Sequence, residues 1–422
     1  MSSNLTNPTT NRLVLLYQLT QAFNSSLDLD EVLNRVMDEI IAVMRAERGF
    51  VMLKEQAGSL VFKVARGLDQ QIIEDPEFHV SRSVVNQVAT SGQAILTSDA
   101  QADERFNIRD SIVYLGLRSI LCVPLKLKER IIGVVYIDSR LQAGIFIQED
   151  LDLLNAIASN AAVAIENARL YQLAIEKGRM EQELLMARRV QLSLLPRGTP
   201  SIEGWEFRTY WKPAREVSGD YYDFIPVANG QIGVVIADVT DKSIAAALFM
   251  AFTRSIVRAN IDYALSPATG IQRANDLILE ETDESLYVTL FYALLNPLTG
   301  LVTYVNAGHN PAILYSQSNP TGHILHLTST GIPLGVEQDS IYAQESATLN
   351  PGDILLLYTD GLTEASNARG EQFSLERLEQ VLLNSAQLSS QDIINAIVAA
   401  VCSFTPTGQP DDDLTLVMIK RL

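Results

Sequence analysis

The sequence predicts an α/β protein with more than one domain, and three observations indicate this. The chain has 422 residues, which is more than a single domain usually holds. Runs rich in β-branched residues, which suit strands, occur together with helical patterns in both halves. A long helical pattern ends near the middle of the chain at Pro196, Gly198 and Pro200. We expect a domain boundary at this interruption.

The composition favours a folded protein and argues against nucleic-acid binding. Hydrophobic residues make up 47% and charged residues 19% of the chain, which is typical of a protein with a core. The net charge is −18, and from residue 200 onward there are 11 basic against 26 acidic residues. A nucleic-acid partner requires a cationic surface, so none is expected. The carboxylates favour either a bound cation or simply a solvated acidic surface.

The cysteine content and the N-terminus bear on where the protein works. Cys122 and Cys402 are the only two cysteines, too few for a disulfide framework or a zinc site. The first residues lack the pattern of a signal peptide. The longest charge-free helical run, 153–165, is shorter than the roughly 20 residues that span a bilayer. We therefore expect a cytoplasmic protein without a membrane contact.

In the N-terminal half, helical patterns alternate with short strand patterns. Strands are expected at 50–53, 60–65, 119–123 and 131–137. A long helix is expected from about 148, where acidic residues fill its first turn, to 195. Its near-heptad spacing suits a parallel coiled coil, although Lys177 and Gln191 fall in the expected seam. A solvated connecting helix is the alternative.

The C-terminal half contains apolar runs that are typical of covered strands. Segments 232–237 and 354–358 are nearly continuous apolar runs and are expected as central strands. Segments 287–295 and 301–306 are separated by a turn sequence and are expected to form a hairpin. Helices are expected over 245–260 and 271–280. The pattern indicates a second α/β domain.

Four segments of this half place Asp beside turn residues: VSGDYYDF (217–224), VVIADVTDKS (234–243), LLLYTDGLTEA (355–365) and PDDDLTLVMI (410–419). Two of these Asp residues end apolar strands, where a buried charge is costly unless a cation or hydrogen-bond donors meet it. Oxygen ligands without His or Cys indicate Mg²⁺ or Mn²⁺. Taken singly, each Asp suits a cap or a turn. The four together favour a metal site.

These segments resemble a known family. EVSGDYYDF, DVTDKSIAAALFM, YVTLFYALLNPLTGLVTYVNAGHNPAILY, GIPLG, LNPGDILLLYTDGLTEA and DDDLT occur in one order over residues 200–422. They resemble a PPM-type metal-dependent Ser/Thr protein phosphatase of the SpoIIE/RsbU branch. Residues 12–170 resemble a GAF sensor domain through LDEVLNRVMDEIIAVMRAERGFVML, SILCVPL, GVVYID and EDLDLLNAIASNAAVAIENARLY. The resemblance implies an antiparallel GAF sheet with helices, a coiled-coil linker helix over 171–199 and a C-terminal αββα sandwich.

The resemblance also implies roles for residues. Asp238 would bridge two metal ions, Mn²⁺ or Mg²⁺, with the backbone carbonyl of Val239 as a further ligand. Asp360 and Asp412 would hold the second ion, and Asp220 would orient a water on the metals, directly or from one shell further out. A water so activated attacks the phosphorus of phosphoserine or phosphothreonine in line.

One segment departs from the family pattern. The family usually has Gly-Lys-Gly where Asp241-Lys242-Ser243 stands here. Glycine tolerates a positive φ better than Asp or Ser, so we expect weaker metal binding, and the effect on activity stays open.

The resemblance implies a signal-regulated phosphatase, which we expect to be a homodimer. Its substrate would be a phosphorylated STAS-type anti-sigma-factor antagonist, and its GAF domain would receive a small-molecule or protein signal. One alternative is a catalytically weak or inactive phosphatase-fold binding module controlled by the GAF domain. Another is a sensor whose C-terminal half only transmits ligand occupancy. Metal-dependent turnover would separate the first interpretation from both alternatives.

Three further residues and the GAF interior allow two interpretations each. His309 is either a general acid for the leaving serine or, as we favour, a residue that stabilises a turn. Lys212 and Arg215 either meet the substrate phosphate or form an ordinary surface pair. The GAF domain either encloses a ligand pocket or serves only for dimerisation.

Overall fold

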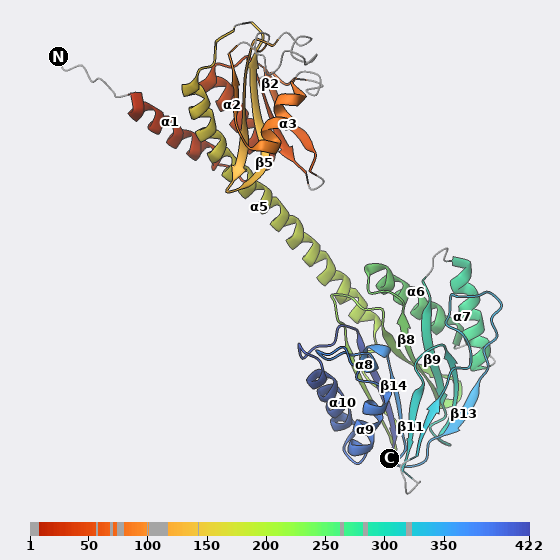
Figure 1. Cartoon of the computed structure of the whole chain (residues 1–422). Helices are drawn as coiled ribbons and strands as arrows, with labels where there is room; N and C mark the ends of the chain where they lie inside the picture. Colours follow the sequence, from red (N-terminus) through yellow and green to blue (C-terminus); the bar gives the residue numbers. More distant parts are fainter. Residues whose placement is uncertain are drawn as a thin grey trace. The chain divides into compact units, whose positions relative to one another are not determined.

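The computed structural model describes residues 8–55, 58–67, 71–73, 80–98, 100, 117–141, 143–261, 266–281, 286–317 and 323–422 (Figure 1). The chain divides into two compact units, Met1–Met180 and Glu181–Leu422. Helix α5 (Gln148–Leu194) contributes residues to both units.

The first unit is built on a five-stranded antiparallel sheet with the strand order β2-β1-β5-β4-β3. Its strands are β1 (Arg48–Lys54), β2 (Leu60–Gly67), β3 (Ile95–Thr97), β4 (Ser119–Leu127) and β5 (Arg130–Ser139). Its helices are α1 (Pro8–Phe23), α2 (Leu29–Met44) and α3 (Arg82–Ser91), together with the first part of α5. Apolar side chains of α2 and α5 pack with one set of strand residues in a first core. Apolar side chains of α3 pack with a different set of strand residues in a second core. The sheet with helices that the GAF resemblance implied is confirmed.

Local sequence explains why α2 forms where it does. Asp28 is the N-cap, and its Oδ1 accepts a hydrogen bond from the backbone N–H of Glu31 at 2.9 Å. Buried residues recur at helical spacing along α2, among them Leu33, Val36 and Ile40. This apolar stripe anchors the helix on the sheet.

The second unit contains two five-stranded antiparallel sheets, with the orders β13-β10-β9-β8-β7 and β12-β11-β14-β15-β6. The first sheet consists of β7 (Tyr221–Val227), β8 (Gln231–Val239), β9 (Val288–Leu295), β10 (Leu301–Ala307) and β13 (Glu345–Thr348). The second consists of β6 (Trp205–Lys212), β11 (Ala312–Ser316), β12 (His323–Leu327), β14 (Ile354–Tyr358) and β15 (Leu414–Arg421). The strands expected at 232–237 and 354–358 and the hairpin of β9 and β10 are confirmed.

Helices cover the outer face of each sheet (Figure 1). Helices α6 (Ile244–Ile261) and α7 (Pro267–Glu281) pack on the first sheet. Helices α9 (Leu375–Ser385) and α10 (Ser390–Phe404) pack on the second, and the short helix α8 (Asp360–Thr363) follows β14. The largest core of the unit fills the space between the sheets and the underside of α6 and α7. The predicted αββα sandwich is therefore confirmed.

Helix α6 is, among the described residues, the one helix long and apolar enough to cross a membrane by length and composition. Its place in the fold explains that composition. Ala246, Phe249 and Met250 are buried in the core of the sandwich. On the same helix, Nη1 of Arg258 donates to the buried carboxylate of Asp223 at 2.6 Å. These contacts are those of a structural helix within the second unit.

The expected long helix is confirmed as α5, but one residue assigned to its seam is placed differently. Gln191 has only 4% of its surface exposed, whereas its neighbours Val190 and Leu192 are 63% and 47% exposed. Its side chain hydrogen-bonds the backbone of Ser218 in the same unit. A side chain committed to this contact cannot also serve as a polar position in a seam between two helices, so the seam assignment of Gln191 is wrong.

A buried ion pair in the first unit gives a test of the fold. Nε and Nη2 of Arg48 donate to the two carboxylate oxygens of Asp138 at 2.8 and 2.7 Å, and both side chains are almost fully buried. Burial outweighs the Arg48 charge and raises the pKa of Asp138 to about 6.

We predict that Asp138→Asn destabilises the first unit by about 3–5 kcal/mol, because it leaves the Arg48 charge buried without a counter-ion. The measurement is urea unfolding at pH 8. Glu31→Gln is the matched control, because it breaks the exposed Glu31–Arg35 pair and should cost less than about 1 kcal/mol. Equal losses in the two variants would contradict the prediction.

Candidate metal centre

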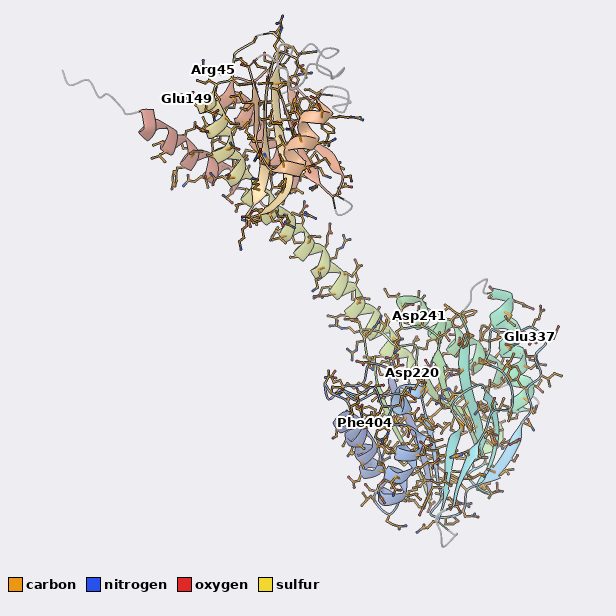
Figure 2. All side chains as sticks on the ribbon, in the orientation of Figure 1. Arg45, Glu149, Asp220, Asp241, Glu337 and Phe404 are labelled. Atoms are coloured by element: carbon orange, nitrogen blue, oxygen red, sulfur yellow. The ribbon has the colours of Figure 1, made fainter. Side chains whose placement is uncertain are left out.

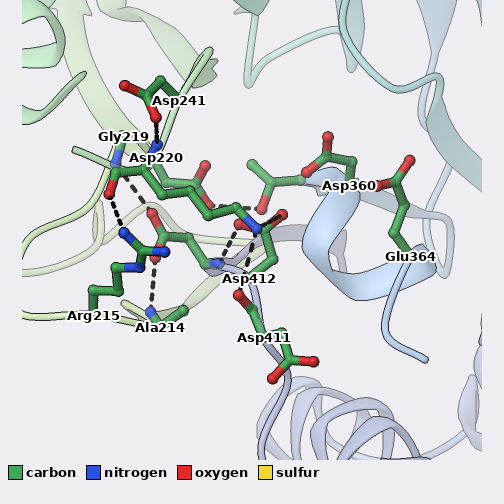
Figure 3. Close-up of polar contacts among 12 residues, drawn as sticks. Ala214, Arg215, Gly219, Asp220, Asp241, Asp360, Glu364, Asp411 and Asp412 are labelled. Carbon is green, nitrogen blue, oxygen red and sulfur yellow. Dashed lines mark hydrogen bonds and ion pairs between the residues drawn. The ribbon is translucent and has the colours of Figure 1, made fainter. Parts of the chain in front are cut away.

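Strand register brings the four Asp-rich segments together in the second unit (Figure 3). Tyr221 pairs with Ala237, so Asp220 and Asp238 lie at neighbouring ends of β7 and β8. In the other sheet, Tyr358 at the end of β14 pairs with Leu416 near the start of β15. This register brings Asp360, just after β14, close to Asp412, just before β15. Asp220, Asp238, Asp360 and Asp412 are called the acidic cluster below.

Asp220 is the most deeply buried member of the acidic cluster, with 1% of its surface exposed. Its Oδ2 accepts hydrogen bonds from the hydroxyls of Thr359 at 2.7 Å and Thr415 at 2.6 Å. Burial, followed by the charges of Asp238 and Asp413, raises its pKa well above the usual value. The two hydroxyls fix one oxygen of the carboxylate and leave the other free of hydroxyl donors.

The other cluster members also repel one another. Burial and then the charge of Asp360 raise the pKa of Asp238 to about 7. Burial and then the charge of Asp412 raise the pKa of Asp360 to about 6. Desolvated carboxylates with raised pKa values that gather in one place are typical of functional sites.

A lysine contributes one positive charge to the acidic cluster. Nζ of Lys242 lies 2.8 Å from Oδ2 of Asp412 (Figure 3). Burial by itself lowers the pKa of Lys242, but the hydrogen bond and charge of Asp412 raise it above its usual value. The cluster therefore already attracts one cation from its own chain.

The donor set fits hydrated Mg²⁺ or Mn²⁺. Across the described ranges, no three His, Cys, Asp or Glu side chains are arranged closely enough to hold one ion between them. Mg²⁺ does not require such a cage, since it keeps several waters and binds through one or two carboxylates. Gly219 packs directly against the carbonyl of Val239, because a Cβ at Gly219 would lie 2.9 Å from that oxygen. This close packing holds the Val239 carbonyl beside the cluster.

Sequence reasoning missed Asp413, which organises the turn before Asp220. Its carboxylate accepts from the backbone N–H of Ala214 at 2.7 Å, the hydroxyl of Ser218 at 2.6 Å and the N–H of Gly219 at 3.1 Å. Three consecutive Asp residues in the last segment indicated that a carboxylate there is important. Only the tertiary structure shows that Asp413 has a different role from Asp412. The hydroxyls of Thr359 and Thr415 were also missed, and residue type alone does not distinguish them from ordinary strand threonines.

Comparison with known proteins identifies both parts of the chain. The sequence model of the GAF domain matches residues 28–165, and that of stage II sporulation protein E (SpoIIE) matches residues 228–422. The phosphoserine phosphatase RsbU of Bacillus subtilis is 31% identical over 245 residues, which cover 57% of this chain and 71% of RsbU. This chain belongs to the SpoIIE/RsbU family of PPM-type phosphatases.

Two further relatives define the extent of the likeness. Protein IcfG of Synechocystis is 29% identical over 275 residues, which are 58% of this chain but only 43% of IcfG. The SiaA-PP2C domain of Pseudomonas aeruginosa has a similar fold, with a TM-score of 0.53 and 18% identity, and the match covers 58% of this chain and 99% of that domain. The PP2C fold is thus shared over the second unit.

The loop that departs from the family pattern has the backbone conformation expected for glycine. Asp241 adopts a φ of +81°, in the left-handed region. Its Oδ1 accepts from the N–H of Lys242 at 2.7 Å, and contacts with Ser243 and Lys242 lower its pKa. The next residue differs, because Ser243 has no positive φ and its Oγ accepts from the N–H of Ala246 at the start of α6. Of residues 241 and 243, Asp241 is therefore the one at which glycine would be less strained.

His309 has a structural role, but its ring joins β9 to β14 rather than stabilising a turn. Its Nε2 donates to the carbonyl of Tyr358 at 3.1 Å, because a carbonyl can only accept. Its Nδ1 then accepts from the hydroxyl of Thr289 at 2.7 Å. Burial lowers the pKa of His309 to about 4. Both ring nitrogens are engaged and the ring is neutral at pH 7, so it is not placed to act as a general acid.

The two basic residues proposed for phosphate contact differ in position. Nη1 of Arg215 donates to the carbonyl of Lys242 at 3.0 Å, which places its guanidinium next to the loop beside the acidic cluster (Figure 3). Lys212 pairs with Leu414 at the end of β6. Figure 2 labels Asp220 and Asp241, which lie at the same end of the second unit.

The first unit contains a separate cavity of about 470 Å³. The lining residues come from β1, β2 and the region of α3: Met52, Leu60, Val61, Phe62, Val80, Arg82, Val85 and Asn86. The cavity gives the GAF domain room for a small ligand, and Arg82 offers it a positive charge.

We predict that His309 makes stability fall as the pH is lowered from 6.5 toward 4. The pKa of His309 in the folded state lies below its value in the unfolded state, so the unfolded state binds the proton first as the pH falls. The contribution of His309 to the free energy of unfolding is therefore fully present only above pH 6.5. The difference corresponds to about 3 kcal/mol at the acidic end. His309→Gln keeps one donor and one acceptor and should show a shallower decline in urea unfolding over this range. Parallel curves for the two proteins would exclude the assignment.

Proposed function

We propose that this chain is a signal-regulated protein Ser/Thr phosphatase that hydrolyses phosphoserine or phosphothreonine on a partner protein. The observation that carries the proposal is the acidic cluster itself. Four carboxylates from distant segments converge at the ends of two facing sheets, and burial and mutual repulsion raise the pKa values of three of them. Such a site is stable when divalent cations neutralise it.

The roles assigned within the cluster follow the family resemblance. Asp238 would hold both Mn²⁺ or Mg²⁺ ions together with the carbonyl of Val239, and Asp360 and Asp412 would hold the second ion. Since no three carboxylates of the described residues lie closely enough to hold one ion, Asp238, Asp360 and Asp412 would have to draw closer to share it. When bound, the two ions supply charge neutralisation for the phosphoryl group and a lowered pKa for a water. Asp220 would orient a water on these ions, since Thr359 and Thr415 bind only one of its oxygens.

The substrate class comes from the relatives. RsbU and RsbP of Bacillus subtilis are both named phosphoserine phosphatases, and this chain spans 71% of RsbU and 46% of RsbP. By this resemblance the phosphorylated partner is a STAS-type anti-sigma-factor antagonist. The GAF cavity would receive the small-molecule or protein signal that controls the reaction.

We further propose a GAF sensor domain at 12–170, a linker helix at 171–199 and a catalytic domain at 200–422. Strand β6 supports the last boundary, because it begins at Trp205 and pairs with β15 along its whole length. We also propose a cytoplasmic homodimer. Pairing through the linker helix is supported by its exposed apolar side chains, such as Leu173 at 52% and Met180 at 65%.

The second candidate function is a catalytically weak or inactive phosphatase-fold binding module. It is favoured by the left-handed Asp241 and by the Lys242 ammonium against Asp412, since both features oppose metal binding. A sensor whose C-terminal half only transmits ligand occupancy makes the same prediction of no turnover.

We predict phosphatase activity that requires Mn²⁺ or Mg²⁺ and disappears with a chelator. Asp238→Ala and Asp360→Ala should each lower turnover of a phosphoester at least 100-fold, because each removes a hard-cation ligand. Asp411→Ala is the matched control, since this exposed Asp adjoins Asp412 outside the proposed ligand set. The mechanism would be contradicted if activity persisted in chelator, or if Asp238→Ala or Asp360→Ala kept half the wild-type rate.

We predict that Asp241→Gly lowers the Mn²⁺ concentration giving half-maximal activity, because glycine adopts the observed φ without strain. Ser243 is left in place, since it caps α6. Asp241→Asn removes the charge but keeps the tolerance for this conformation, so it should leave the metal requirement nearly unchanged. If Asp241→Gly needs the same or more Mn²⁺, the loop is already well formed and the Asp241 charge assists the metal.

A further inference from the structure

Gln191 is an unusual residue of helix α5. It lies one turn before the end of the helix and is 4% exposed, between Val190 at 63% and Leu192 at 47%. A buried amide is costly unless its donors and acceptor are satisfied. In the structure the backbone of Ser218, two residues before Asp220, provides the hydrogen-bond partners of this amide.

The amide of Gln191 binds both backbone groups of one residue. Its Nε2 donates to the carbonyl of Ser218 at 2.6 Å, and its Oε1 accepts from the N–H of Ser218 at 3.0 Å. The opposite amide orientation would set donor against donor and acceptor against acceptor, so the pairing defines the orientation. The Gln191 amide therefore forms with Ser218 the pair of hydrogen bonds that the backbone of a neighbouring strand forms in a sheet.

Ser218 passes this constraint to the acidic cluster. Its Oγ accepts from the N–H of Asp220 at 3.0 Å and donates to Asp413 at 2.6 Å. The next residue, Gly219, packs against the Val239 carbonyl so closely that a Cβ would lie 2.9 Å from it. Any displacement of Ser218 therefore shifts Asp220 and presses on Val239.

We propose that Gln191 is a positioning residue for the metal site: through its amide, the end of α5 holds the turn at 217–220 and so sets the placement of Asp220 and the Val239 carbonyl. The inference rests on the metal site proposed above. It follows that any change that moves residues 181–194 of α5 alters metal affinity without contacting a ligand residue.

The test compares Gln191→Leu with Gln182→Leu in the full chain. Gln182 is an exposed glutamine on the same helix, so its replacement controls for a new apolar side chain on α5. Mn²⁺ binding is measured by calorimetry without substrate, and amide hydrogen exchange at residues 214–220 is measured in metal-free protein. We expect Gln191→Leu to weaken Mn²⁺ binding at least tenfold and to speed exchange at Ser218, Gly219 and Asp220 at least tenfold. Gln182→Leu should leave both unchanged.

A second variant guards against misfolding. Gln191→Glu keeps the side-chain size but sets an oxygen against the Ser218 carbonyl, so it should change both readouts in the same direction. At saturating Mn²⁺, kcat should fall while KM for the phosphoester stays constant, since Gln191 touches only the turn. Mn²⁺ affinity within twofold of wild type together with unchanged exchange would overturn the inference. If the wild-type protein binds no Mn²⁺, the proposed function fails, and the exchange rates in metal-free protein alone decide the role of Gln191.

Discussion

The second unit depends on one buried carboxylate that joins its two sheets. Asp220 stands at the start of β7 in the first sheet, and the hydroxyls that bind it belong to Thr359 and Thr415, at the ends of β14 and β15 in the second sheet. Thr359 Oγ1 also accepts from the N–H of Thr415, so the three residues form one network. A buried charge tolerates no loss of partners, and this requirement holds the ends of the sheets in one arrangement.

His309 makes a second, neutral connection between the same sheets. Its ring joins Thr289 on β9 to the carbonyl of Tyr358 on β14. Asp238 pairs with Thr289 across the first sheet, and Asp360 follows Tyr358 by two residues. A protonated imidazole in this place would add a positive charge beside the carboxylates and would compete there with a bound cation. A neutral imidazole aligns the two strand ends without perturbing the carboxylates.

The strained or costly features of the unit gather on one side of it. Asp241 holds a left-handed backbone, Lys242 offers its ammonium to Asp412, and the turn at 217–220 depends on Gln191 and Asp413 for its backbone partners. Each feature lies within a few residues of the acidic cluster. Such concentration of local cost is typical of functional sites, where the surrounding fold supplies the compensating stability.

The sequence by itself determined the two-part organisation and many of the helices and strands, and the family resemblance of its four Asp-rich segments supplied the residues of the acidic cluster. Periodicity was sufficient because burial of apolar side chains sets both helix and strand, and the position of Asp at strand ends indicated where charge would collect. Asp241 was also recognised as a residue in the place of a glycine.

Only the tertiary structure decided which polar residues support the cluster. Gln191 has the spacing of a helical seam residue, yet it binds Ser218, and Asp413 lies next to a proposed ligand but organises the turn at 217–220 instead. A hydrogen bond depends on the positions of both partners, and here the partners are separated by 27 and 195 residues. Periodicity reports which side of an element is buried, but not which distant backbone group meets it there.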